Sequence, residues 1–417
     1  MITVSFINSA YQVLKNVVRR TPLEHNQEWS DKLGFDLWMK REDQQLTRSY
    51  KIRGAYYFIS EVASKNPDVK VVCASAGNHA QGLAWSCSKL GVHGTIFMPK
   101  TTPKQKLNRT AKLGGDWVKI VLFGDTFDDA YSAALEYEKS TQAQFIHPFD
   151  HEKIISGQGT VGLEILEQFE SATGKLPDVI LVPIGGGGLS SGIIVWVKEH
   201  SPQTVIIGVE PQGAAAMKLS LENGTISSLS SMDTFVDGAA VKTPGSLNFE
   251  IIENGIEKII TTAEGQICTT ILEIYNDAAI VLEPAGALTL SALRDIKHEL
   301  KGKSVVCILS GGNNDINRMA EIQERSLLYE GLKHYFIIRF AQRPGALRDF
   351  LDKILGPHDD ITRFEYVKKT KREGAPALVG IEVHEAKDFI ALQQRMDEAG
   401  MDYTLINEYP TLFELLV

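Results

Sequence analysis

Short apolar runs recur through the middle of this 417-residue chain, separated by amphipathic segments long enough to form helices. Clear examples are residues 69–74, 179–182, 205–209 and 304–309. Runs that are apolar on both faces are typical of strands in a parallel sheet that is covered by helices on both sides. The sequence therefore predicts an α/β architecture over most of its length.

The pattern changes near residue 330, where a helix over residues 321–330 is expected to end at Gly331. Beyond it the sequence predicts a βαββαβ order, which is a ferredoxin-like split pattern. The expected elements are strand 335–340, helix 345–355, strand 361–367, strand 377–383, helix 386–399 and strand 403–406. The charged segment 368–374 is interpreted as a hairpin loop without a function. We therefore expect two domains, residues 1–330 and residues 331–417.

The composition excludes several classes of protein. A net charge of -9 argues against nucleic-acid binding, and no apolar run is long enough for a membrane span. The N-terminus lacks the pattern of a secretory signal, so a cytoplasmic location is expected. The four cysteines are interpreted as reduced core residues. No metal site is predicted, because Pro148 separates His147 from His151 and makes a shared helix face improbable.

Lys51 lies at the expected start of a helix. A lysine in such a position is usually a solvated surface charge. Here the apolar side chains of Tyr50, Ile52 and Ala55 flank it and favour desolvation of the amine. Desolvation disfavours the ammonium form and leaves a nucleophilic amine that is able to form a Schiff base. Lys51 is therefore the candidate catalytic residue.

A turn of small residues follows the apolar run 69–74 and opens a helical pattern. It consists of Ser75, Ala76, Gly77, Asn78, His79 and Ala80. Small residues at a strand–helix turn leave successive N–H groups that are able to bind an anion such as a carboxylate. The alternative is a tight turn in which Asn78 caps the helix, since Asn is a common cap.

Four successive glycines follow the apolar run 179–182. The segment is Gly185, Gly186, Gly187, Gly188 and Leu189. Such a run costs chain entropy, which makes sense where the backbone must wrap closely around a phosphate. The spacing matches neither the nucleotide-triphosphate loop nor the dinucleotide fingerprint. We interpret it as a phosphate site without a nucleotide, and a merely flexible loop is the alternative.

Ser310 follows the apolar run 304–309. Ligands bind at the carboxyl ends of strands in doubly wound sheets. A simple turn residue is the alternative for Ser310 taken alone. Together, the lysine, the anion-binding turn, the phosphate loop and this hydroxyl predict a site for one phosphorylated aldehyde.

In order and approximate spacing, these four elements resemble the fold-type-II (tryptophan-synthase-β-like) pyridoxal phosphate enzymes, and within them the threonine ammonia-lyases. Further segments similar to that family are Thr21-Pro22-Leu23, Lys40-Arg41-Glu42-Asp43, Glu210-Pro211 and Glu283-Pro284-Ala285-Gly286-Ala287. The resemblance covers nearly all of residues 1–325 and implies two parallel-sheet subdomains. It also implies pyridoxal 5'-phosphate as cofactor and conversion of threonine to 2-oxobutanoate and ammonia, the first step of isoleucine biosynthesis.

The resemblance implies a role for each candidate residue. Lys51 would bind the cofactor as a Schiff base and remove the Cα proton. Asn78 would contact the cofactor's 3'-oxygen, residues 75–80 would hold the substrate carboxylate, and residues 185–189 would hold the phosphate. Ser310 would bind the pyridine nitrogen. Because a neutral hydroxyl does not stabilise a pyridinium, the ring is a weaker electron sink, which favours elimination over transamination.

Two other functions stay open. The nearer is a serine racemase or serine dehydratase. In the racemases a serine precedes Gly-Asn-His and acts as an acid and base, whereas Ala76 here cannot transfer a proton, which favours a lyase. The second is a catalytically silent amino-acid sensor, against which the intact Lys51 and Ser310 argue. The sequence does not decide whether serine is used as well as threonine.

Residues 331–417 resemble the ACT-like regulatory domain of biosynthetic threonine ammonia-lyases. The segments that carry this resemblance are Arg343-Pro344-Gly345-Ala346-Leu347, Phe364-Glu365-Tyr366 and Val379-Gly380-Ile381. It implies isoleucine as an effector. The chain has room for one such unit where long family members carry two, so we expect a homo-oligomer that completes the effector site. A domain that serves only as an assembly surface is the alternative.

Overall fold

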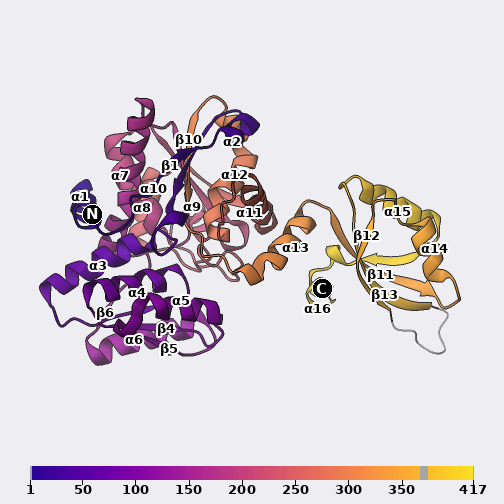
Figure 1. Ribbon diagram of the computed structural model, residues 1–417, viewed down its shortest axis with the longest axis horizontal. Coiled ribbons are helices and arrows are strands. Elements are labelled where there is room, and N and C mark those ends of the chain that lie inside the picture. Colours follow the sequence, from indigo (N-terminus) through magenta and orange to yellow (C-terminus); the bar gives the residue numbers. More distant parts are fainter. Residues whose placement is uncertain (1, 367–373, 417) are drawn as a thin grey trace. The chain divides into compact units, whose positions relative to one another are not determined.

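The computed structural model describes residues 2–366 and 374–416. The chain divides into two compact units, Met1–Ile316 and Asn317–Val417, which Figure 1 colours by sequence. Helix α13 (Met319–Tyr329) therefore belongs to the second unit, and it is followed by Gly331 in the left-handed region, with φ +68°.

A six-stranded sheet forms the centre of the first unit, with the order β1-β2-β10-β7-β8-β9. Its strands are β1 (Leu23–His25), β2 (Asp36–Arg41), β7 (Val179–Pro183), β8 (Val205–Pro211), β9 (Lys258–Thr262) and β10 (Ser304–Leu309). Only β1 runs antiparallel to its neighbour, and the other pairs are parallel. Strand β10 lies between β2 and β7, which brings Ser310 close to segments far away in the sequence.

Helices cover both faces of this sheet. The sheet and these helices together form the large lobe. One face packs against α1 (Val4–Leu14), α7 (Glu152–Thr173), α8 (Gly188–His200) and α10 (Ser246–Gly255). On the other face, the Cys307 thiol approaches the backbone of Thr289 in α12 (Pro284–Leu300). The remaining helices are α2 (Gln27–Leu33), α9 (Ala216–Asn223) and α11 (Glu264–Ala278). The predicted doubly covered parallel sheet is confirmed.

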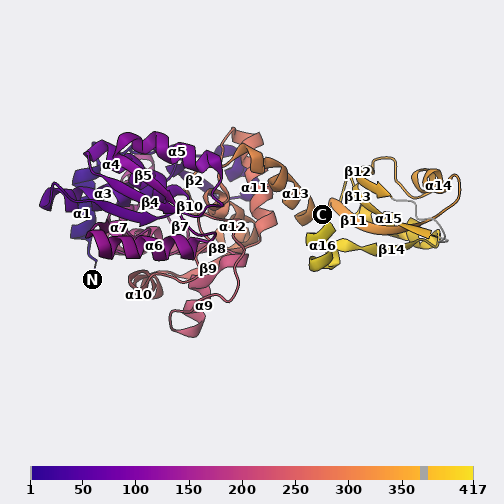
Figure 2. The same cartoon turned by 90° about the horizontal axis from the view of Figure 1, so that it is seen from below.

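A second parallel sheet has the order β5-β4-β3-β6 and forms the small lobe with its helices. Its strands are β3 (Val71–Ala74), β4 (Gly94–Met98), β5 (Val118–Leu122) and β6 (Gln144–Phe145). Figure 2 shows α4 (Asn78–Leu90) and α5 (Lys104–Gly114) on one side of this sheet and α6 (Phe127–Thr141) on the other. Helix α3 (Lys51–Lys65) packs beside α4.

The second unit is the βαββαβ fold that the sequence predicts. Its elements are β11 (Lys333–Ala341), α14 (Ala346–Lys353), β12 (Asp360–Tyr366), β13 (Gly374–Glu382), α15 (Asp388–Glu398) and β14 (Asp402–Leu405). The sheet is antiparallel, with the order β12-β13-β11-β14. Helix α16 (Pro410–Leu416) was not predicted. The hairpin loop predicted at 368–374 falls almost entirely on residues 367–373, outside the described residues.

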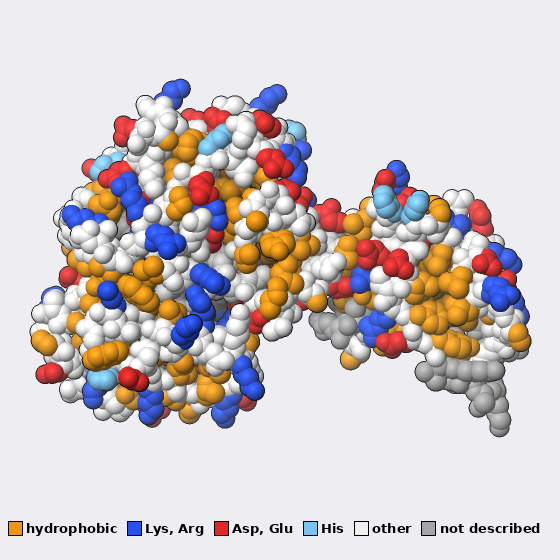
Figure 3. All heavy atoms as spheres, in the orientation of Figure 1, with side chains coloured by type: hydrophobic (Ala, Val, Ile, Leu, Met, Phe, Trp, Pro, Cys, Tyr) orange, Lys and Arg blue, Asp and Glu red, His pale blue; other side chains and the backbone are white. Residues whose placement is uncertain are grey.

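Partly exposed aromatic side chains lie on β12 of the second unit. Phe364 and Tyr366 both pack against Phe340 of β11, with ring centroids 5.9 and 6.3 Å away. Figure 3 shows apolar side chains gathered on the face of this unit that it displays. In neither unit do the described residues contain a helix with the length and apolar character needed to cross a membrane.

Candidate active site

Lys51 is the first residue of α3 and projects a partly buried amine toward the loop that follows β6. Its Nζ donates a hydrogen bond to Pro148 O at 3.0 Å and lies 5.4 Å from the centre of the Tyr50 ring. Burial lowers the pKa of this amine to about 8, against a smaller opposing effect of the Glu283 carboxylate. The desolvation that the apolar neighbours predict is therefore present at Lys51.

The segment before Lys51 is joined to the segment that begins at Ser310. Tyr50 N donates to Ser310 O at 3.2 Å, and Ser49 pairs with Gly311 in an isolated antiparallel bridge. The Ser310 hydroxyl is buried and donates to Ala285 O at 3.1 Å. Two of the four predicted elements, the lysine and the hydroxyl, thus lie side by side.

Asn78 joins the turn before α4 to the same region. Its Nδ2 donates to Glu283 Oε1 at 2.6 Å, and its Oδ1 accepts from Asn313 Nδ2 at 2.7 Å. The residue in the N-cap position of α4 is Gly77, and no side chain caps this helix. The interpretation of Asn78 as a helix cap is therefore wrong, and its side chain instead faces the segment after β10.

The turn at the start of α4 presents open backbone donors. Gly77 N donates to Ser75 Oγ at 3.2 Å, which fixes the turn. The next N–H groups, those of Asn78, His79 and Ala80, begin the helix and therefore have no acceptor within it. Uncapped N–H groups at a helix N-terminus form a site for an anion.

His79 takes no part as a base near neutral pH. Its ring is buried, and Nε2 donates to Ile146 O at 2.8 Å. Burial and the nearby charge of Lys51 lower the pKa of His79 to about 3. Among the described residues, its Nδ1 has no hydrogen-bond partner.

The glycine loop lies between β7 and α8 and is packed closely against the segment after β6. Gly187 has φ +95°, in the left-handed region that favours glycine, and it is the uncapped N-cap of α8. A Cβ on Gly186 would lie 2.3 Å from the Phe149 ring, and one on Gly188 would lie 2.8 Å from Phe149 O. Gly185 is confined in the same way, since a Cβ there would lie 2.9 Å from the backbone of Ala239.

All four predicted elements therefore meet at the carboxyl ends of β3, β7 and β10. The loop from Pro148 to Phe149 contacts both Lys51 and the glycine loop, so these elements share one boundary. The N-termini of α4 and α8, where Asn78 and Leu189 lie, supply two separate groups of free N–H donors. A phosphate, an amino-acid carboxylate and an aldehyde that reacts with an amine fit this set of groups.

Sequence reasoning placed Glu283 in a segment similar to the family but gave no role to this acid, which lies at the centre of the site. Glu283 is only 5% exposed, and burial together with the charge of Asp237 raises its pKa to about 7. A Cβ on Gly311 would lie 2.1 Å from Glu283 Oε1, and one on Gly238 would lie 3.5 Å from the same atom. The one available signal was an acid directly before a proline at a helix start, since α12 begins at Pro284.

Glu210, in the Glu210-Pro211 segment at the end of β8, binds the start of α9. Its carboxylate accepts hydrogen bonds from Met217 N at 2.9 Å and Lys218 N at 2.8 Å, at the start of α9. The described residues contain no group of three or more His, Cys, Asp and Glu side chains arranged to hold a metal ion. The four cysteines are free and buried, as predicted.

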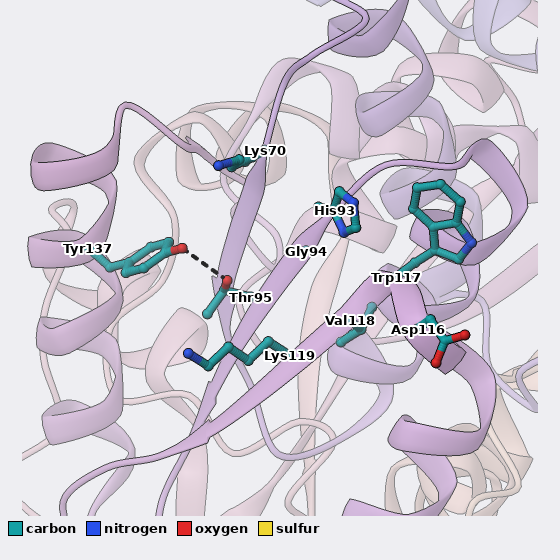
Figure 4. Close-up of a pocket in the computed structure, with 9 residues that line it drawn as sticks. All are labelled: Lys70, His93, Gly94, Thr95, Asp116, Trp117, Val118, Lys119 and Tyr137. Atoms are coloured by element: carbon teal, nitrogen blue, oxygen red, sulfur yellow. Dashed lines mark hydrogen bonds between the residues drawn. The ribbon is translucent and has the colours of Figure 1, made fainter.

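A separate surface hollow of about 310 Å³ lies at the opposite, amino ends of β4 and β5 (Figure 4). Its lining includes Lys70, Lys119 and Trp117, and Thr95 Oγ1 donates to Tyr137 Oη at 3.3 Å. It contains none of the four predicted elements. The carboxyl ends of the strands are therefore the candidate active site.

Comparison with known proteins identifies relatives of both units of the chain. Residues 14–311 match the family model described as a pyridoxal-phosphate dependent enzyme, and residues 324–416 match the C-terminal regulatory domain of threonine dehydratase. The chain is 52% identical to a biosynthetic L-threonine dehydratase of Halalkalibacterium halodurans, covering 98% of this chain and 97% of that one. It is 48% identical to a Bacillus subtilis protein of the same name, covering 100% of this chain and 98% of that one.

A solved structure gives the same result for the fold. The processed form of threonine deaminase isoform 2 from Solanum lycopersicum superposes with a TM-score of 0.73 at 37% identity, covering 78% of this chain and 88% of that one. The match over residues 14–311 places the chain among the pyridoxal-phosphate dependent enzymes. Within that class, its full-length similarity and its C-terminal unit show that it belongs to the biosynthetic threonine dehydratase family.

Proposed function

We propose that this chain uses pyridoxal 5'-phosphate to convert L-threonine to 2-oxobutanoate and ammonia, the first step of isoleucine biosynthesis. The observation that carries the proposal is Lys51, whose amine has its pKa lowered to about 8 by burial and contacts the Pro148–Phe149 loop that also packs against the glycine loop. The names of the relatives, biosynthetic L-threonine dehydratases at 48–52% identity, support the substrate.

Each element of the site has a proposed role. Lys51 attaches the cofactor and then, as a free amine, takes the proton from Cα of the substrate. Residues 185–189 hold the phosphate at the N-terminus of α8, and residues 75–80 hold the substrate carboxylate at the N-terminus of α4. Asn78 would contact the cofactor's 3'-oxygen. When bound, the cofactor supplies the electron sink for loss of the Cα proton.

Ser310 and Ala76 decide which reaction follows. The neutral Ser310 hydroxyl would be the group that meets the ring nitrogen, and because it carries no negative charge it would not favour a protonated ring, so that elimination of the β-hydroxyl would be preferred to transamination. Ala76 carries no group that could return a proton to the opposite face of Cα. These two residues favour a lyase over a racemase.

The first experiment compares Lys51→Ala with Lys65→Ala, at the two ends of α3. The Lys51 variant is expected to lose the visible absorbance of bound cofactor and the production of 2-oxo acid, while its circular dichroism is unchanged. Lys65 is exposed, so its variant should keep both. Full activity of Lys51→Ala would refute the assignment, and racemised threonine or serine among the products would favour the racemase alternative.

We propose further that the second unit binds isoleucine and lowers the activity. The partly exposed Phe364 and Tyr366, packed against Phe340, offer an apolar surface suited to an aliphatic side chain. A single unit of this kind completes its effector site by pairing, so the chain acts as a homo-oligomer, in the cytoplasm. Inhibition requires isoleucine to favour a low-activity state, with a coupling of about 1–3 kcal/mol.

The test is a threonine titration of the full chain with and without millimolar isoleucine, with alanine as the control ligand. Isoleucine is expected to shift the threonine curve about 5- to 150-fold, and alanine is not. Sedimentation at several protein concentrations measures the oligomeric state. If isoleucine leaves the threonine curve unchanged, the second unit serves only as an assembly surface. If the chain sediments as a monomer, the proposal of an effector site completed by pairing is wrong.

A further inference from the structure

An ion pair joins the two lobes at the edge of the candidate active site. Lys106 lies on α5 of the small lobe, and its ammonium group donates to the carboxylate of Asp237, in the large-lobe segment between α9 and α10. Helix α5 lies on the side of the four-stranded sheet that faces the large lobe (Figure 1). Because one residue belongs to the small lobe and the other to the large lobe, the pair forms only where the two lobes meet.

The neighbouring residue places this pair beside the reacting groups. Gly238 follows Asp237, and a Cβ on Gly238 would lie 3.5 Å from Glu283 Oε1 and 3.9 Å from Asn78 Nδ2. The charges of Asp237 and Lys106 both act on the pKa of Glu283, after burial: Asp237 raises it and Lys106 lowers it. Asp237 therefore lies close to Glu283 and, through Gly238, to Asn78.

One turn further along α5, the contact between the lobes is unfavourable. Burial and the nearby charge of Arg48, in the large lobe, lower the pKa of Arg109. The Nε atom of Arg109 is buried and has no hydrogen-bond partner among the described residues. Like charges on both sides of this boundary oppose its closure, whereas the attraction between Lys106 and Asp237 favours it.

We propose that Lys106 and Asp237 form a latch that closes α5 over the mouth of the active site and controls substrate entry. The two residues are positioning residues: they set the equilibrium between open and closed lobes and touch no reacting atom. The latch is partly solvated, with side chains 24% and 39% exposed, so salt and substrate compete with it. A closed mouth excludes water and places the substrate carboxylate against the N-terminus of α4.

The kinetic part of the test rests on the proposed dehydratase activity. The variants are Lys106→Met, Asp237→Asn, the double variant and the conservative Lys106→Arg, all in the full-length holoenzyme. Each charge-removing variant is expected to raise KM for threonine about two- to five-fold, as befits a partly solvated pair, while the absorbance of the bound cofactor stays unchanged. The double variant should resemble the single ones, because each removes the same interaction. Lys106→Arg should restore a KM near that of the parent protein.

A second measurement does not depend on the activity. Amide hydrogen exchange over α5 is expected to become about two- to five-fold faster in Lys106→Met and Asp237→Asn, and raising the salt should speed it in the parent protein only. The control pair is Lys258–Glu299, whose side chains are 38% and 57% exposed on the large lobe. Removing it should leave both the exchange and KM unchanged.

The two measurements separate the possible failures. Exchange over α5 that is unchanged in both variants refutes the latch, whatever the kinetics show. Effects of the single variants that add in the double variant refute it as well, since independent residues would then be responsible. Faster exchange in a protein that does not act on threonine would support the latch and reject the proposed substrate.

Discussion

Four charged side chains form a network inside the first unit, and removing one of them should be costly. Arg53 of α3 binds Glu42 at 2.7 Å and Glu164 of α7 at 2.7 Å, and Lys40 of β2 binds Glu164 at 2.6 Å. Lys40 and Arg53 are fully buried. Although burial raises the pKa of Glu164, the charges of Arg53 and Lys40 outweigh this effect and hold it below its usual value.

The chosen perturbation is Glu164→Gln, which keeps the shape of the side chain and removes its charge. Glu164 takes part in two ion pairs, so the variant leaves two cations facing one carboxylate with little water nearby. Breaking a buried ion pair from one side costs about 3–5 kcal/mol, since the remaining charge stays buried and uncompensated. We expect the free energy of unfolding of the first unit to fall by about that amount.

The assay is urea unfolding followed by tryptophan fluorescence. All five tryptophans lie in the first unit, at positions 29, 38, 85, 117 and 196, so the signal reports that unit alone. The matched control is Glu167→Gln, one turn further along α7. Glu167 pairs with Arg20 at 2.9 Å, and the two side chains are 49% and 47% exposed.

An exposed pair contributes only about 0–1 kcal/mol, so Glu167→Gln should unfold at nearly the same urea concentration as the parent chain. The difference between the free energies of unfolding of the two variants measures the effect of burial, because both variants replace Glu by Gln on the same helix and remove the same charge. The reasoning is wrong if the free energies of unfolding of the two variants differ by less than about 1 kcal/mol. Such a result would show that the buried cations remain compensated when Glu164 is replaced by a neutral residue.

Three further outcomes are expected. Gly311→Ala should weaken cofactor binding at least ten-fold in an absorbance titration, because its Cβ would lie 2.1 Å from Glu283 Oε1 and displace that carboxyl; unchanged affinity would contradict this. The carboxyl of Glu283 has a folded pKa of about 7, above its unfolded value, so the parent chain loses stability as the pH rises from 5 to 8. Glu283→Gln lacks this titration. Its free energy of unfolding in urea, measured on the cofactor-free protein, should therefore gain about 2–3 kcal/mol relative to the parent chain over that pH range. A constant difference would show that the carboxyl does not titrate there. Ser310→Asp should raise transamination relative to elimination, and an unchanged product ratio would count against the neutral-ring argument.

Much of the fold could be predicted because its central strands are buried on both faces. The apolar run 304–309 coincides with β10, and the run 179–182 is one residue shorter than β7. The edge strands β1 and β6 have only three and two residues and no apolar run, so the sequence gives no signal for them. The strand order could not be predicted either, because the position of β10 between β2 and β7 depends on contacts between residues distant in sequence.

The site could be predicted where it depends on local backbone chemistry. The turn before α4 and the glycine loop both follow apolar runs, and the ends of parallel strands meet at one edge of a sheet. The buried acid Glu283 and the pair of Lys106 with Asp237 were missed, because each depends on a partner from another part of the chain. Charged residues are usually solvated, which is also why the burial of Arg53 could not be predicted.

The position of Arg53, two residues after Lys51, explains how a buried amine and a buried charge network coexist at one helix start. Two residues in an α-helix differ by about 200° in direction, so the two side chains point to nearly opposite sides of α3. The network can therefore fix the first turn of α3 without placing its charges beside the Lys51 amine. In agreement, burial and Glu283 are the influences on the pKa of Lys51, and no member of the network is among them. Loss of the network in Glu164→Gln should accordingly destabilise the first unit while the Lys51 amine keeps its lowered pKa, which the pH dependence of its reaction with an added aldehyde would measure.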